Sequence, residues 1–167
     1  MKSVQVITSS LVVVFLLLAG VVPVNAVQEP KTGIDFPSKY GGSKLSKLGV
    51  RTKGPIKVYA VGQYDNSFLL KMSMSVGAEK MATAMGDALK PRCKDAASIE
   101  EFKTVMASGL PNGCKKGMTL AFVAKGGKLS MSVNNKKIGA ISSKPLAKAF
   151  TGIYTDKKAV CKMNPIE

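Results

Sequence analysis

The stretch GVRTKGPIKVYAVGQY, residues 49–64, places a cation, Arg51, just before an apolar strand that carries Lys57 and Tyr59. A guanidinium is a planar fork that binds a carboxylate through two hydrogen bonds, and a phenol offers one further donor. Strict alternation would put Lys57 and Tyr59 on one face of strand 56–61. The stretch is therefore either an ordinary strand with two polar-tipped side chains or one wall of a pocket that holds an acid group.

The second interpretation requires the chain to turn. Eight residues of one straight strand would separate Arg51 from Tyr59 by roughly 26 Å. Thr52-Lys53-Gly54-Pro55 is a suitable turn, because glycine and proline favour chain reversal. The sequence alone leaves the register of the two flanking segments open.

Several other chemistries are excluded or poorly supported. The chain has no histidine, so neither a Ser-His-Asp nor a Cys-His arrangement can form. Its three cysteines, Cys93, Cys114 and Cys161, show no Cys-x-x-Cys spacing, and we expect no metal site and no cofactor. An oxidising compartment would permit one disulfide and leave one thiol over, with the pairing open.

The N-terminus predicts a secretory signal peptide over residues 1–26. Lys2 precedes an apolar run from Leu11 to Val22, and the small residues of Val24-Asn25-Ala26 suit a cleavage site. A membrane anchor needs roughly 18 or more uninterrupted apolar residues, and Pro23 breaks this run. We expect a secreted or lumenal protein, with onward targeting to an organelle left open.

The remainder of the chain is strongly basic. Residues 1–26 hold one lysine and no acid, so the rest keeps 24 basic and 10 acidic residues. This balance favours acidic partners: anionic lipid, nucleic acid or small acids. Six Phe, four Tyr and no Trp supply few rings for stacking bases, so no specific nucleic-acid partner is expected. The lysines are dispersed, which indicates a solvated cationic surface. We expect a monomer whose contact with anionic membrane surfaces is weak at most.

Periodicity predicts strands first. Residues 27–45 hold prolines, glycines and serines and are expected to form an irregular N-terminal arm with one short strand around residues 34–36. The main domain spans residues 46–162. It begins with strand 56–61 and a half-buried strand over 68–76, in which Phe68, Leu70 and Met72 alternate with other residues.

Two helices and three strands follow. Residues 78–90 have apolar positions every four residues and end at Pro91, and Ser98-Ile-Glu-Glu101 is a capping box for a second helix that Gly109 and Pro111 stop. Strands 118–124, 128–133 and 136–141 are joined by Gly126-Gly127 and Asn134-Asn135 turns, and a last helix opens at Lys144-Pro145. The order β-β-α-α-β-β-β-α indicates an α+β fold with an antiparallel sheet backed by helices.

Three segments taken together resemble the chalcone isomerase-like family in order and spacing: GVRTKGPIKVYAVGQY, AEKMATAMGDAL and KKGMTLAFVAKGGKLSMSVNNKKIGAISSKPLAKAFTGIY. The match covers most of residues 34–160. It implies an open-faced β-sandwich, a large antiparallel sheet backed by helices. The family comprises plant enzymes that close chalcones into flavanones and non-enzymatic relatives, some of which bind fatty acids.

The resemblance favours the binding relatives. Arg51 and Tyr59 match the arginine and tyrosine that hold a fatty-acid carboxylate in them, whereas the enzymes have a threonine at the position of Tyr59. The enzymes also carry a Tyr and an Asn, seven apart, on a helix over the cleft. The helix taken as comparable, SIEEFKTVMASG, has neither. Methionines could line an adaptable pocket for the hydrocarbon tail or simply fill the core: Met72, Met74, Met81, Met85 and Met106.

The sequence therefore leaves three alternative functions open. The first is a non-catalytic binder of a fatty acid or a similar amphipathic carboxylate, held by Arg51 and Tyr59. The second is an intramolecular lyase of the chalcone isomerase type, in which the same two residues polarise a carbonyl. The third is a cationic structural or surface-binding protein without a ligand. A cavity would distinguish the third from the other two.

Overall fold

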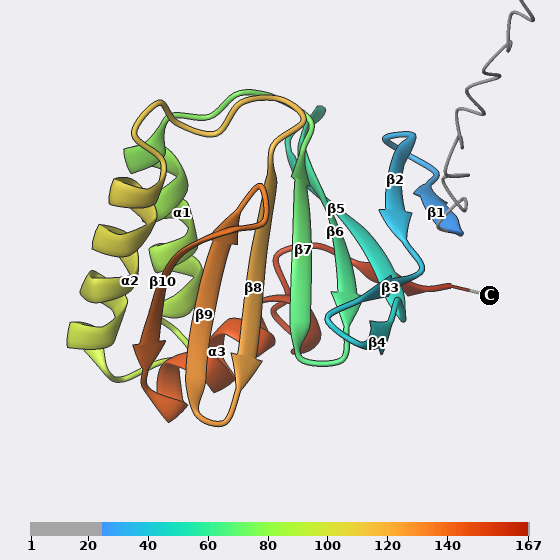
Figure 1. Ribbon diagram of the computed structural model, residues 1–167. Helices are drawn as coiled ribbons and strands as arrows, with labels where there is room; N and C mark the ends of the chain where they lie inside the picture. Colours follow the sequence, from blue (N-terminus) through green and yellow to red (C-terminus); the bar gives the residue numbers. More distant parts are fainter. Residues whose placement is uncertain (1–24, 167) are drawn as a thin grey trace, which may run out of the picture.

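The computed structural model describes residues 25–166. Most of the expected signal peptide lies outside these residues. The described part forms one large sheet, a group of three helices and an N-terminal arm of small hairpins (Figure 1). No helix in this part is long and apolar enough to cross a membrane.

The large sheet has seven antiparallel strands in the order β10-β9-β8-β7-β6-β5-β11. From β5 to β10 the strands follow one another as a meander, interrupted only by the two helices between β7 and β8. Their bounds are β5 Lys47–Lys53, β6 Ile56–Tyr64, β7 Ser67–Met72, β8 Thr119–Lys125, β9 Lys128–Val133, β10 Lys136–Ser142 and β11 Met163–Pro165. The predicted turns at Gly126-Gly127 and Asn134-Asn135 are confirmed, and all four residues have positive φ, as tight hairpins require.

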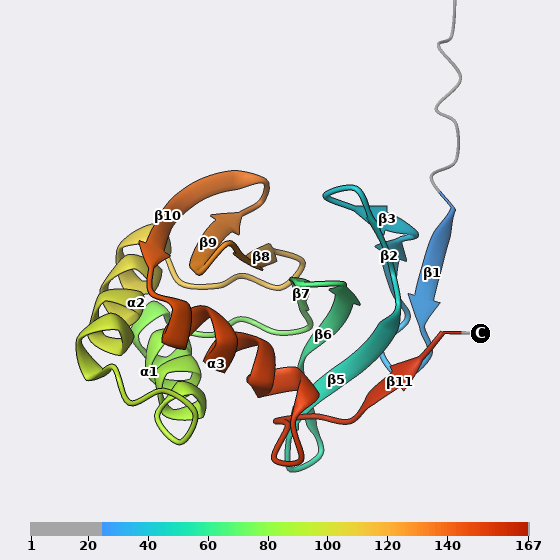
Figure 2. The ribbon, with the colours of Figure 1, turned by 90° about the horizontal axis from the view of Figure 1, so that it is seen from below.

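Helices α1 (Ala78–Leu89), α2 (Ala96–Gly109) and α3 (Lys144–Thr155) lie on one side of the sheet, and the arm lies on the other (Figure 2). The main core fills the space between helices and sheet. Its centre is a cluster of rings, with Phe150 stacked on Phe122 at 4.5 Å and Tyr154 stacked on Phe68 at 5.1 Å between ring centroids. The expected α+β architecture is confirmed.

The arm is more regular than expected. Its strands are β1 Ala26–Glu29, β2 Ile34–Pro37, β3 Lys39–Tyr40 and β4 Ser43–Lys44, which form two hairpins. The predicted short strand at residues 34–36 is confirmed as β2, and the other three were not expected. The arm covers a second, smaller core on the sheet face opposite the helices, where Phe36 packs with Tyr64 and Leu69. The Tyr64 hydroxyl donates to the Pro37 carbonyl at 2.7 Å. The prediction of a half-buried strand for β7 was therefore wrong, because the arm buries its second face.

Two further boundaries differ from expectation. Strand β7 ends at Met72 and not at Val76, because the Ser73 amide turns to the Val58 carbonyl and the chain leaves the sheet. Helix α2 begins at Ala96, three residues before Ile99, and its N-cap is Asp95. Asp95 accepts a hydrogen bond from the Ser98 amide at 3.1 Å, so the residue read as a cap is inside the helix.

Asp95 also joins the starts of two helices. It accepts from the hydroxyl of Ser98 and, at 3.0 Å, from that of Ser143, which is the N-cap of α3. These hydrogen bonds hold the pKa of Asp95 below its usual range, the Ser98 hydroxyl contributing most. A lowered folded-state pKa stabilises the protein above the unfolded value of about 3.9, and this contribution is lost as the pH falls through the folded value.

We therefore predict that Asp95→Asn lowers the urea midpoint at neutral pH and flattens its fall on acidification. The parent should lose stability below about pH 4 more steeply than the variant. The measurement is urea unfolding by circular dichroism across this pH range. Glu101→Gln, at an exposed position of the same helix, is the control and should keep the parental slope. Equal slopes for the parent and Asp95→Asn would contradict the role given to Asp95.

Candidate functional site

Arg51 and Tyr59 face each other directly across the β5–β6 pair. Their Cα atoms are register partners in this antiparallel ladder, so both side chains leave the sheet on the same face. The turn that joins the strands is Gly54-Pro55, with Gly54 at φ 58°, while Thr52 and Lys53 belong to β5. The expected reversal between the two residues is present, two residues shorter than predicted.

A β-bulge in β6 decides which side chains accompany them. Arg51 pairs with Tyr59 and Thr52 pairs with Lys57, so Val58 is an extra residue in β6. One extra residue reverses the alternation of side chains beyond it. Val58 and Tyr59 both line a cleft on the helix side, whereas Lys57 lies on the arm side, where its ammonium donates to the Lys31 carbonyl. The expectation that Lys57 and Tyr59 share a face was wrong for this reason.

The cleft has a volume of about 800 Å³. It lies between the β5–β6 hairpin, the segment after β7, helix α1 and the end of α3. Its apolar lining consists of Ile56, Val58, Met74, Val76, Met81, Ala84, Met85, Ala88, Ile153 and Val160. Of the five methionines singled out from the sequence, Met74, Met81 and Met85 line the cleft, and Met72 and Met106 are part of the core.

The charged side chains that line the cleft are mostly cationic. Arg51, Lys53 and Lys80 line it, and among residues 25–166 none of the three has a carboxylate within 4.0 Å. The acid in the lining, Asp87, is paired with Lys90 at 2.8 Å. An apolar cleft with unneutralised cations along it suits a ligand that has a hydrocarbon body and an acidic end.

Arg51 is oriented from the far end of the chain. Its Nη1 donates to the Val160 carbonyl at 2.7 Å, which leaves the other guanidinium N–H groups free for a ligand. Val160 lies in the loop after α3, and its own amide donates to the Ile153 carbonyl at 2.9 Å. The position of the guanidinium thus depends on the conformation of loop 156–162.

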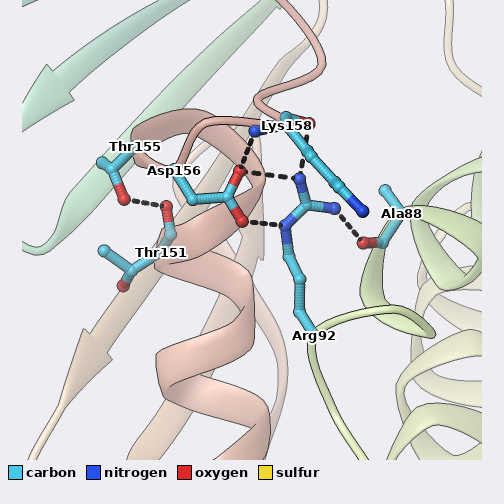
Figure 3. A network of polar contacts seen from close by, with 6 residues as sticks. All are labelled: Ala88, Arg92, Thr151, Thr155, Asp156 and Lys158. Carbon is cyan, nitrogen blue, oxygen red and sulfur yellow. Dashed lines mark hydrogen bonds and ion pairs between the residues drawn. The ribbon is translucent and has the colours of Figure 1, made fainter.

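An arginine on the other side of the loop holds that conformation (Figure 3). Arg92 binds Asp156 with two hydrogen bonds, of 2.8 and 3.0 Å, and donates to the Ala88 and Lys158 carbonyls at 2.6 Å each. The Asp156 carboxylate also accepts from the Lys158 amide at 2.8 Å. Arg92 therefore ties the end of α1 to the loop that carries Val160.

Tyr59 is buried and hydrogen-bonded to a second phenol. Its hydroxyl lies 3.1 Å from that of Tyr154, on the last turn of α3. Burial raises the pKa of Tyr59 to about 12, against the opposite effect of its bond with Tyr154, and burial also raises the pKa of Tyr154. Both phenols are therefore neutral donors at physiological pH. Sequence reasoning missed Tyr154, although it lies four residues after Phe150 on the predicted helix and so shares the face of that ring.

All three cysteines are free thiols. Burial raises the pKa of Cys161, in the loop that carries Val160, to about 11, and burial raises the pKa of Cys114 to about the same value. A thiol with a raised pKa is a poor nucleophile. No group of three or more potential metal ligands occurs among residues 25–166.

The helix over the cleft is α1 and not α2. Lys80, Met81 and Met85 of α1 line the cleft, whereas α2 contributes no residue to it and packs against α1 and β10. The expectation that SIEEFKTVMASG covers the cleft was therefore wrong. The sequence of α1, AEKMATAMGDAL, also contains neither tyrosine nor asparagine.

The comparisons with known proteins support the fold. No family model matches the sequence, and neither does any curated protein. Among solved structures, the crystal structure of a fatty-acid binding protein of Arabidopsis thaliana matches with a TM-score of 0.66. The two proteins are 19% identical, and the match covers 81% of this chain and 91% of that one. The chain thus has the chalcone isomerase-like fold, as the resemblance implied.

The Arg92 network generates a prediction about loop 156–162. Arg92→Gln should loosen this loop, so that the amides of Lys158 and Val160 exchange hydrogen faster, as measured by hydrogen–deuterium exchange with mass spectrometry. Lys158→Ala is the matched control, because Arg92 contacts only the backbone carbonyl of Lys158. Exchange in the loop that is unchanged in Arg92→Gln would show that Arg92 does not hold it.

Proposed function

We propose that the protein is a non-catalytic binder of a fatty acid or a similar amphipathic carboxylate. The observation that carries this proposal is the Arg51 guanidinium, which lies beside an apolar cleft without a carboxylate partner and directly across the strand pair from Tyr59. The likeness to a fatty-acid binding protein of the same fold supports it. The presence of the cleft favours it over a purely structural cationic protein.

The carboxylate of the ligand would be held by Arg51 and Tyr59. The free N–H groups of Arg51 supply the charge and a two-pronged donor. Each phenol is both a donor and an acceptor, so Tyr154 can donate to the Tyr59 oxygen while Tyr59 donates to the carboxylate. This order satisfies both buried hydroxyl groups when the ligand is bound. Tyr154 would thus be a positioning residue for Tyr59.

The hydrocarbon tail would occupy the apolar part of the cleft. Each CH₂ group removed from water contributes about 0.8 kcal/mol. The volume of about 800 Å³ falls within the range of roughly 300–1,000 Å³ that is usual for small-molecule sites. Met74, Met81 and Met85 in the lining are unbranched and polarisable, which suits a tail of variable length and shape.

We predict that Arg51→Ala weakens binding of a long-chain fatty acid by about one to two powers of ten. A charge-assisted hydrogen bond contributes roughly 1.5–3 kcal/mol. Tyr59→Phe keeps the ring and should cost only about 0.5–1.5 kcal/mol. Titration calorimetry measures both.

The control for charge is Lys148→Ala, at an exposed position of α3 away from the cleft, which should bind like the parent. If Arg51→Ala binds the fatty acid as tightly as the parent, Arg51 does not hold the carboxylate. A parent that binds no fatty acid would sink the proposed function as a whole.

The alternative function, ring closure of a chalcone, makes a different prediction. The resemblance implies that the enzymes use a threonine on the strand of Tyr59 and a Tyr and an Asn on the helix over the cleft, and α1 has neither of the last two. A 2′-hydroxychalcone should therefore close no faster with the protein than in buffer, as followed by absorbance. A saturable rate above the spontaneous one, lost in Arg51→Ala but not in Lys148→Ala, would favour the isomerase.

A further inference from the structure

A second pocket, of about 380 Å³, lies at the ends of β6 and β7, next to the arm. Its wall includes Ile34 of the β1–β2 hairpin, Lys57 of β6, Lys71 and Ser73 at the end of β7, and Lys116 of the turn before β8. Three lysines from three separate segments thus line one small space. The pocket shares no lining residue with the cleft that contains Arg51.

The three lysines lack acidic partners. Among residues 25–166, no carboxylate lies within 4.0 Å of any of their ammonium groups. Lys57 and Lys71 donate instead to the carbonyls of Lys31 and Asp35, the latter at 2.7 Å, and these bonds fix the two side chains at the arm. An ammonium has three donors, so each keeps two for a ligand.

The acid of the neighbouring turn is already satisfied. Glu29 is 3% exposed and accepts hydrogen bonds from the amides of Lys31 and Thr32 and from the Thr32 hydroxyl, at 3.1, 2.8 and 2.7 Å. The Glu29 carboxylate is therefore occupied by donors of its own turn and does not pair with the three lysines. Like charges gathered without a counterion repel one another. An anion in the pocket would remove this repulsion.

Ser73 is a second, independent observation at the same place. Its hydroxyl oxygen is buried and has no hydrogen-bond partner, one of two such side-chain atoms among the described residues. A buried polar group without a partner costs stability, and most buried polar groups in proteins have one. Rotation about its χ1 bond would turn this hydroxyl into the pocket that Ser73 lines, where an oxyanion would accept a hydrogen bond from it.

We propose that this pocket binds a phosphate-type oxyanion, either free or as the headgroup phosphate of a lipid. Several ammonium groups and a hydroxyl match a compact group that carries more than one negative charge and several acceptor oxygens. A single carboxylate would leave part of this donor set unused. The site is independent of the proposed fatty-acid cleft, because the bulge at Val58 directs Lys57 away from that cleft.

The test uses Lys116→Ala and Ser73→Ala. Neither change removes a contact to the N-terminal arm. In the described structure, the Lys116 ammonium and the Ser73 hydroxyl make no hydrogen bond. Titration calorimetry with inorganic phosphate at constant ionic strength forms the first arm. Flotation with phosphatidylcholine vesicles, with and without phosphatidic acid, forms the second. Lys148→Ala controls for the loss of one positive charge far from the pocket.

We expect the parent to bind in at least one arm and each variant to bind about tenfold more weakly, the effect of one charge-assisted hydrogen bond. Binding of free phosphate would identify a soluble ligand, and binding only to phosphatidic acid would identify a lipid headgroup. Removal of an unpaired buried hydroxyl should leave folding stability equal or higher, so weaker phosphate binding by Ser73→Ala cannot arise from unfolding. Absence of binding in both arms, or an equal loss in Lys148→Ala, would overturn the proposal.

Discussion

The extra residue in β6, Val58, determines what each face of the sheet offers at this end. Without it, strict alternation would place Lys57 beside Tyr59, inside the apolar cleft. With it, Val58 and Tyr59 both reach the cleft, and Lys57 reaches the arm. A bulge also bends and twists its strand locally, and bulges are frequent near functional sites. Here it separates the carboxylate site proposed at Arg51 from the lysine pocket on the arm side.

The second support of the site comes from α3 and the loop behind it. α3 packs against the sheet through Phe150 and brings Tyr154 within hydrogen-bond distance of Tyr59. The following loop returns to β5, where the Val160 carbonyl accepts from Arg51. Arg92, partly buried at the end of α1, keeps that loop in place. The proposed headgroup site is therefore assembled from strand pairing, one helix and one loop, with each part held by a separate contact.

The regular elements could be predicted because their signals are local. Alternation in β7, the four-residue spacing in α1 and the Asn134-Asn135 turn each act within a few residues. The bulge had no such signal, since Lys57-Val58-Tyr59 reads equally well as a regular strand. The assignment of α2 to the cleft failed because a sequence does not say which of two amphipathic helices lies nearer the sheet edge. Of the N-terminal hairpins only β2 was predicted, because their strands are two to four residues long and depend on packing against the sheet.

The bond between Arg51 and Val160 joins residues 109 positions apart in the sequence. Contacts of this separation form late, because the chain between them must first be ordered. During synthesis the strand that carries Arg51 leaves the ribosome long before the loop that orients it. A nascent chain can thus hold the β5–β6 hairpin and still lack a competent headgroup site. Ligand binding would then require a completely synthesised and folded chain. It could therefore be used to measure the fraction of such chains during translation.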